Sequence, residues 1–107
     1  MKMDKKNDLK IVKEFRENLV KAIILRKLIL FGSRARGKTN KWSDFDLIVV
    51  SPDFKKKNFL ERGGDLYDYW DYDYPVDFLC YTPEEFDKLK KRVTIVREAL
   101  KEGIEIK

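Results

Sequence analysis

The chain has 107 residues, of which 43% are hydrophobic and 40% are charged, and its formal net charge is +5 at pH 7. This length fits one ordinary domain that can bury a core without disulfide or metal staples. One cysteine and no histidine exclude an internal disulfide, a Cys/His zinc site and a Cys–His catalytic pair. Any bound metal would need oxygen ligands, which favours Mg²⁺ or Mn²⁺.

Neither a membrane span nor a secretory signal is predicted. The longest apolar runs, such as 22–25 and 28–31, are far shorter than the roughly 20 residues that cross a bilayer. The charged N-terminus lacks the apolar segment of a signal peptide. We therefore expect a cytoplasmic protein without a membrane partner. Its mild basic charge is compatible with a nucleotide or RNA partner, and equally with a solvated Lys-rich surface.

Hydrophobic periodicity predicts alternating helices and strands in the first half of the chain. An amphipathic helix is expected over about residues 7–24, where apolar side chains recur at helical spacing. Short apolar runs predict strands over 27–31 and 45–51. Between these strands we expect a short helix over 34–38 that ends at Gly37.

The second half begins with residues 53–75, which fit neither period. A helix over 58–66 is weakened by two adjacent glycines. After a predicted strand over 76–81, the segment Thr82-Pro83-Glu84-Glu85 forms a capping box that predicts a helix start. The remaining expected elements are a last helix marked by Val93, Val96 and Leu100 and ended by Gly103, and a short strand over 104–107. Together they predict a single domain over 1–107 of the α/β (α+β) class with a small sheet.

The stretch between the first two predicted strands carries the clearest chemical signal. Gly32 and Ser33 end one strand, and Asp44 and Asp46 follow after ten further residues, at the start of the next. Alternate strand residues project to the same face, so these two carboxylates would act together as hard oxygen ligands. Asp77, which opens the third strand, could complete a cluster. Crowded carboxylates need cations, and two Mg²⁺ ions there could clamp the attacking and leaving oxygens of a nucleotidyl transfer.

The same loop suits a bound phosphate group. Gly32 allows a ligand to approach the backbone, and Ser33 offers a hydroxyl and an amide donor. Four basic side chains could neutralise a triphosphate, namely Arg34, Arg36, Lys38 and Lys41. For the two lysines a solvated surface role is an equal alternative.

An Asp-x-Asp pair alone is a weak motif in a chain with 11 aspartates. A second pair, Asp71 and Asp73, has neither a preceding Gly-Ser nor a following apolar strand, and we interpret it as part of a solvated loop. The aromatic residues of 67–74 are expected to pack or to border an interface. Cys80 alternates with Asp77 along the third strand and is expected to be buried and inert.

The string GSRARGKTNKWSDFDLIVV, residues 32–50, resembles the signature of the DNA polymerase β-like nucleotidyltransferase superfamily. More specifically, it is similar to the minimal nucleotidyltransferase (MNT) branch, the MntA-like antitoxins of HEPN–MNT toxin–antitoxin pairs. The segment 76–78 resembles the third-acid strand of that branch, and residues 95–104 resemble its terminal helix and turn. The resemblance extends over about residues 8–106 and implies the nucleotidyltransferase fold, with a small mixed sheet flanked by helices.

This resemblance implies roles for the motif residues. Asp44, Asp46 and Asp77 would be catalytic and would hold two divalent ions, Mg²⁺ or Mn²⁺, and Asp77 would help to activate the attacking hydroxyl. The residues implied to bind the triphosphate of ATP are Gly32, Ser33, Arg34 and Arg36. The implied reaction transfers AMP from ATP, or another NMP from its NTP, to a tyrosine of a HEPN toxin partner and so neutralises the toxin.

Two other functions stay open. The chain could be a non-catalytic antitoxin that neutralises its partner by forming a complex, or it could transfer a nucleotide to RNA or to a small molecule. Small-molecule transferases of this superfamily usually enclose the acceptor with an extra domain, for which 107 residues leave no room. A homo-oligomer is also compatible with the sequence. Replacing Asp44 and Asp46 distinguishes an enzyme from a binder, because only the enzyme would lose protection of its partner.

Overall fold

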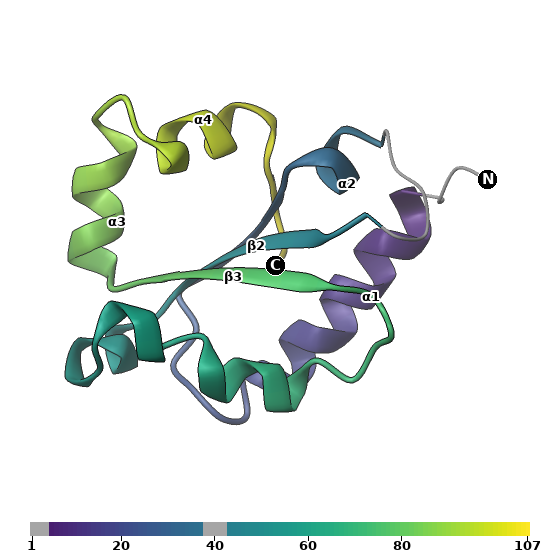
Figure 1. Cartoon of the computed structure of the whole chain (residues 1–107), viewed down its shortest axis with the longest axis horizontal. Coiled ribbons are helices and arrows are strands. Elements are labelled where there is room, and N and C mark those ends of the chain that lie inside the picture. The colour runs from purple at the N-terminus through teal and green to yellow at the C-terminus, as the bar shows by residue number, and fades with distance from the viewer. Residues whose placement is uncertain (1–4, 38–42) are drawn as a thin grey trace.

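The structure is a computed structural model that describes residues 5–37 and 43–107, and its centre is a four-stranded mixed sheet (Figure 1). The strands are β1 (Lys27–Phe31), β2 (Phe45–Val50), β3 (Val76–Tyr81) and β4 (Ile104–Glu105), in the order β3-β2-β1-β4. Strand β1 is antiparallel to β2 and β4, whereas β2 and β3 are parallel. Helices flank this sheet, so the predicted fold class is confirmed.

Strand alternation divides the sheet into two apolar faces. One face packs against α1 (Lys5–Leu19) and carries the larger core. Its sheet residues include Leu28, Leu30, Phe45, Leu47, Val49 and Cys80. The other face packs against α3 (Pro83–Lys90) and α4 (Ile95–Glu102) through a smaller cluster. Its sheet residues include Ile29, Ile48, Val50 and Tyr81.

The segment that sequence periodicity did not resolve is the crossover between the parallel strands. It contains three 3₁₀ helices, Pro52–Lys56, Phe59–Glu61 and Gly64–Tyr69, in place of the helix predicted over 58–66. Parallel neighbours require a long connection, usually an α-helix. Here Trp70 follows the last 3₁₀ helix and is only 8% exposed, with its ring 5.3 Å from that of Phe15 on α1. Burial of this aromatic side chain therefore holds the crossover against α1.

Several element ends differ from their predicted positions. Helix α1 ends at Leu19 instead of near residue 24, although no glycine or proline follows it. The last helix begins at Ile95, which leaves Val93 outside it and 83% exposed. The final strand contains two residues only, Ile104–Glu105. None of the helices in the described part of the chain is long and apolar enough to cross a membrane.

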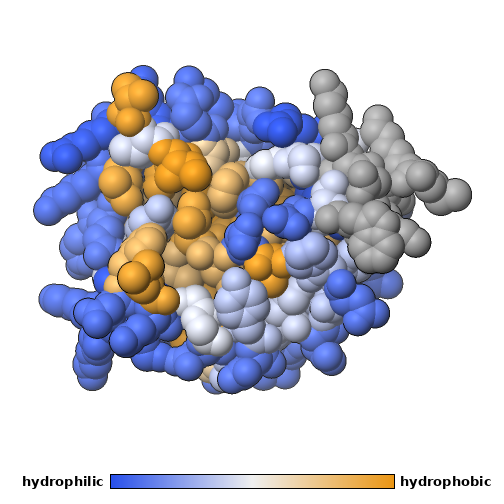
Figure 2. All heavy atoms as spheres, viewed as in Figure 1, coloured by the Kyte–Doolittle hydropathy of each residue, from blue (hydrophilic) through white to orange (hydrophobic). Residues whose placement is uncertain are grey.

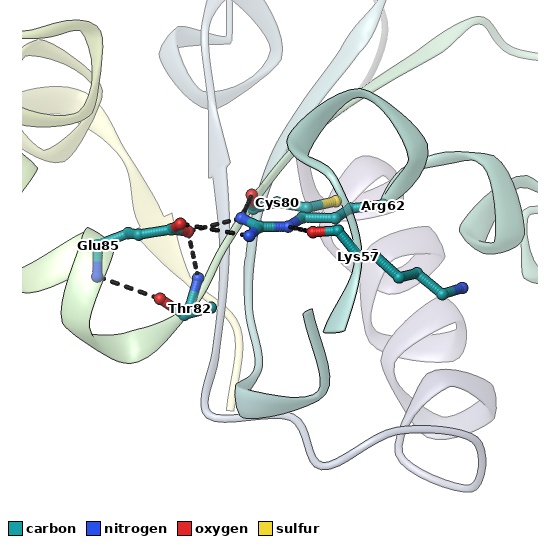
Figure 3. A network of polar contacts seen from close by, with 5 residues as sticks. All are labelled: Lys57, Arg62, Cys80, Thr82 and Glu85. Atoms are coloured by element: carbon teal, nitrogen blue, oxygen red, sulfur yellow. Dashed lines mark hydrogen bonds and ion pairs between the residues drawn. The ribbon is translucent and has the colours of Figure 1, made fainter. Parts of the chain in front are cut away.

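The predicted capping box at Thr82 is confirmed and is part of a larger polar network (Figure 3). The Thr82 hydroxyl accepts a hydrogen bond from the Glu85 amide, and the Glu85 carboxylate accepts one from the Thr82 amide. The same carboxylate accepts two hydrogen bonds from the guanidinium of Arg62, at 2.6 and 3.2 Å. Arg62 also donates to the carbonyl oxygens of Lys57 and Cys80. The guanidinium thus joins the crossover, the edge strand β3 and α3.

Candidate functional site

Two of the three predicted acidic residues are directly paired across the parallel strands. Asp46 on β2 is the register partner of Asp77 on β3, so both side chains lie on the sheet face that α3 and α4 partly cover. Asp44 immediately precedes β2, two residues before Asp46, and is exposed. The fold therefore brings the three carboxylates to one end of two neighbouring strands.

The carboxylates interact electrostatically. The pKa of Asp46 is raised to about 6, first because the side chain is partly buried and then because Asp77 and Asp44 carry like charges. The positive charge of Arg36 acts in the opposite direction. Asp46 is thus the group at which burial and crowding most oppose ionisation, and a cation at this edge would relieve both effects.

The chemistry of these donors fits a divalent cation, because three carboxylates offer only hard oxygen atoms. Within residues 5–37 and 43–107, however, no three acidic or thiol side chains converge closely enough to form a ready-made metal site. Repulsion between like charges disfavours closer convergence of these carboxylates, although their residues lie at the same edge of the sheet. Asp44, Asp46 and Asp77 are the residues that would hold the ions.

Gly32 lies directly against this acidic edge. Its φ of 75° and ψ of −157° belong to a backbone region that is essentially restricted to glycine. A Cβ atom at this position would come within 2.3 Å of a carboxylate oxygen of Asp46. Two features therefore require glycine at position 32, namely its backbone conformation and the close approach of Asp46.

Arg34, which the sequence predicts to bind the triphosphate, is buried in this structure. Its side chain is fully buried, and its guanidinium forms an ion pair with Asp8 at 2.9 Å. It also donates to the carbonyl oxygen of Ser43 at 2.9 Å and lies 4.0 Å from the ring centroid of Phe45. Because it joins α1 to both ends of the motif loop, Arg34 stabilises the loop that presents Gly32 and Asp44.

Ser33 and Arg36 begin and end the short helix α2 (Ser33–Arg36), which Gly37 terminates in the left-handed conformation at φ 75°. This confirms the predicted end at Gly37, although the helix begins at residue 33 and not at 34. Arg36 is about half exposed, unlike Arg34, and is the basic side chain of this helix that a ligand could reach. The predicted contributions of Lys38 and Lys41 lie outside the described residues.

A pocket of about 300 Å³ adjoins the acidic edge. It lies between the end of β1, α2 and α4, and its lining includes Phe31, Gly32, Arg36, Ile95, Ala99 and Glu102. Phe31 is the register partner of Asp46, which connects the pocket to the carboxylates. Figure 2 shows hydrophobic residues (orange) in the middle of the face between α4 and β3, with hydrophilic residues (blue) toward its outline.

Sequence reasoning missed Asp8 and Glu102. Asp8 is only 1% exposed and follows the helical spacing of Val12, Phe15 and Leu19, so an acid within the apolar stripe of α1 was the available signal. Glu102 had no comparable signal, because its contact with Arg36 joins residues 66 positions apart. Both residues form ion pairs with arginines of α2.

The environments of the second aspartate pair and of the cysteine agree with those predicted from the sequence. Asp71 and Asp73 are exposed in the loop before β3, as expected for a solvated pair. Cys80 is 2% exposed, and burial raises the pKa of its thiol to about 12, so it is inert as a nucleophile. The aromatic residues of 67–74 have different environments, because Trp70 belongs to the core whereas Tyr67 and Tyr69 are exposed.

The profile of the nucleotidyltransferase domain family matches residues 9–105. The chain therefore belongs to the nucleotidyltransferase domain family. No curated protein matches its sequence.

Two solved structures have a similar fold. A candidate nucleotidyltransferase from Sulfolobus solfataricus superposes with a TM-score of 0.66 and 24% identity, covering 94% of this chain and 80% of that one. A toxin–antitoxin structure with AMP-PNP superposes with a TM-score of 0.53 and 23% identity, covering 98% of this chain and 73% of that one. At these identities the similarity concerns the fold alone.

Proposed function

We propose that the chain is a metal-dependent nucleotidyltransferase that transfers AMP from ATP to a tyrosine hydroxyl of a HEPN-type toxin partner and so acts as its antitoxin. The observation that carries this proposal is the register pairing of Asp46 with Asp77, beside Gly32 and Asp44. Family membership supports the transfer reaction. The resemblance of residues 32–50 to MNT antitoxins supports the partner and the acceptor.

In this mechanism, Asp44, Asp46 and Asp77 would hold two divalent ions, Mg²⁺ or Mn²⁺, which would neutralise the negative charge that develops during the transfer. The acceptor oxygen attacks the α-phosphorus of ATP in line, a new P–O bond forms, and the bond to pyrophosphate breaks. Asp77, the exposed carboxylate on β3, takes the hydroxyl proton. The Ser33 amide and Arg36 bind the triphosphate beside Gly32.

The test follows transfer of label from α-labelled ATP, with Mg²⁺, to the protein encoded next to this chain. We expect the partner to be labelled on tyrosine. The Asp44→Asn/Asp46→Asn variant should lose at least about 100-fold in rate, because it removes carboxylates that act on the transition-state charge. The Asp71→Asn/Asp73→Asn variant is a matched control, since it changes the same motif in an exposed loop and should keep full activity.

A non-catalytic antitoxin is the second candidate, and exposed apolar side chains favour it. Leu60, Val93 and Ile95 are 92%, 83% and 58% exposed, and a bound partner would cover such apolar side chains. If the partner stays silent in a stable complex while no label moves, the binding function replaces the enzymatic one. Label that appears on RNA or on a small molecule, with the partner unlabelled, would assign a different acceptor.

A further inference from the structure

An ion pair spans the pocket beside the acidic edge. Arg36 at the end of α2 contacts Glu102 at the end of α4, with 2.9 Å between the guanidinium nitrogen and the carboxylate oxygen. Both residues line the pocket with Gly32. The side chains are 48% and 53% exposed, so solvent and a ligand can reach both partners.

The position of Glu102 is not explained by the stability of its helix. Glu102 is the last residue of α4, where the partial negative charge of the helix end disfavours a carboxylate. In the described part of the chain, the contact that offsets this cost is the one with Arg36. Arg36 in turn is the reachable arginine of the motif loop, because Arg34 is buried against Asp8.

We propose that Glu102 is a positioning residue that holds Arg36 while the pocket is empty and releases it to the triphosphate when a nucleotide binds. This inference rests on the proposed function, since it assumes that a triphosphate binds beside Gly32. The pair thereby sets nucleotide affinity, because binding must first break it.

The exchange is energetically accessible. An exposed ion pair contributes roughly 0.2–1 kcal/mol, whereas charge-assisted bonds from Arg to a phosphate are among the stronger hydrogen bonds. Glu102 is half exposed, so water solvates its carboxylate after release and no buried charge is left behind. A triphosphate carries several negative charges and therefore competes well with one carboxylate for the same guanidinium.

The test measures binding of Mg-ATP and of inorganic tripolyphosphate by calorimetry, with the Glu102→Gln variant. This substitution keeps the shape of the side chain and removes its charge. We expect both dissociation constants to fall by about two- to five-fold, which corresponds to the strength of an exposed pair. Adenosine lacks the triphosphate, so its binding should not change.

Glu105→Gln is the matched control. It removes one partner of another long-range exposed pair, Lys27–Glu105 at 3.4 Å, whose side chains are 41% and 36% exposed. It makes the same change in net charge, and Lys27 lies at the end of β1 opposite Gly32. Its dissociation constants should equal those of the original chain. The unfolding temperature of Glu102→Gln should stay the same or rise, because an unfavourable helix-end charge is removed.

An Arg36→Gln background separates the proposal from a general charge effect. There, Glu102→Gln should leave both dissociation constants unchanged, since no guanidinium remains to be released. Unchanged or weaker binding by Glu102→Gln alone, or an equal gain in the Arg36→Gln or Glu105→Gln proteins, would overturn the proposal. If the original chain binds no nucleoside triphosphate with Mg²⁺, the proposed function fails as well. Normal binding that is insensitive to Glu102 overturns only the present inference.

Discussion

Arg34 and Arg62 lie inside the protein beside acidic partners, whereas Asp44, Asp46 and Asp77 lie at one edge of the sheet. Arg34 contacts Asp8 on α1, and Arg62 contacts Glu85 on α3. Among the ion pairs formed within residues 5–37 and 43–107, none involves the three aspartates. Within the described residues, the buried arginines are thus held by acidic partners, whereas the positive charge of Arg36 acts on Asp46 without forming an ion pair with it.

The comparison shows how a small, densely charged domain keeps its binding edge open. A buried charge is tolerated only with a partner and further hydrogen bonds, and both arginines have these. Strand pairing places Asp46 opposite Asp77, and Gly32 leaves room for the Asp46 carboxylate, so backbone geometry brings these residues to one edge despite their like charges. The interactions that stabilise the folded sheet therefore outweigh the repulsion between the aspartates at its edge.

The largest expected effect comes from breaking the fully buried pair. Asp8→Asn removes the buried carboxylate that the guanidinium of Arg34 contacts at 2.9 Å, which should lower the free energy of unfolding by about 3–5 kcal/mol. Urea denaturation measures this change. The double variant Asp8→Leu/Arg34→Met removes both charges and should recover part of the loss. A single variant within about 1 kcal/mol of the original protein would show that the pair is not needed for stability.

Gly32→Ala tests the close approach at the acidic edge. The new methyl group requires a disfavoured φ of 75° and collides with Asp46 at 2.3 Å, so we expect a loss of about 1–3 kcal/mol. Gly64→Ala is the control, because its methyl group would have no neighbour within 4 Å. Chemical denaturation of both variants provides the comparison. Equal stability for the two would contradict the role assigned to Gly32.

The Arg62–Glu85 pair predicts a pH dependence. Hydrogen bonds from Arg62 are the main reason that the pKa of Glu85 lies below its usual value of 4.5. The folded state therefore binds this proton more weakly than the unfolded state, and the pair stabilises above pH 4.5. This stability is lost as the pH falls through the lowered folded-state pKa. Because Glu85 is partly exposed, the loss should be below about 1 kcal/mol.

The pH prediction is checked by thermal unfolding between pH 3 and pH 7, with Glu85→Gln as the comparison. The original protein should lose more stability than the variant at the acidic end, since glutamine does not titrate. If the unfolding temperatures of the two proteins change with pH in the same way, Glu85 contributes nothing to the loss of stability at low pH. The Asp87→Gln variant, which removes an exposed carboxylate elsewhere on α3, controls for general charge effects.

The smallest change in the free energy of unfolding is expected from a substitution at the acidic edge. With a chelator present, Asp46→Asn should raise the free energy of unfolding by about 0.2–1 kcal/mol, because it removes a like charge opposite Asp77. Added Mg²⁺ should stabilise the original protein and leave the variant unchanged. Scanning calorimetry with and without Mg²⁺ measures both effects. A variant that gains as much from Mg²⁺ as the original would place the cation elsewhere.

Local patterns predicted the strands well and the connecting segments poorly. The strands over 27–31 and 76–81 have the predicted bounds, because short apolar runs between turn residues have few alternatives. Helix α1 was predicted too long because nothing after Leu19 breaks a helix, and the chain turns there to reach β1. The hydrophobic residues of the crossover follow neither helical nor strand periodicity. Its packing depends instead on long-range contacts of Trp70 with aromatic residues of α1 and β2.

The candidate site was predicted only in part, for a related reason. Alternation along a strand identified Asp46, and Asp77 was recognised as an acid that opens a strand. Arg34 and Arg36 look equivalent in the sequence, since both are charged and two residues apart. The structure distinguishes them, because one points toward Asp8 in the core and the other toward Glu102 at the surface.

The sequence by itself determined the family, the motif residues and most local elements, because spacing along the chain controls local backbone geometry and the face on which a side chain lies. Only the tertiary structure decided which charges are buried, that β2 and β3 are parallel with Asp46 opposite Asp77, and that α4 completes the pocket beside Gly32. These features depend on contacts between residues far apart in the chain. Their energies come from burial and pairing, which no local pattern records.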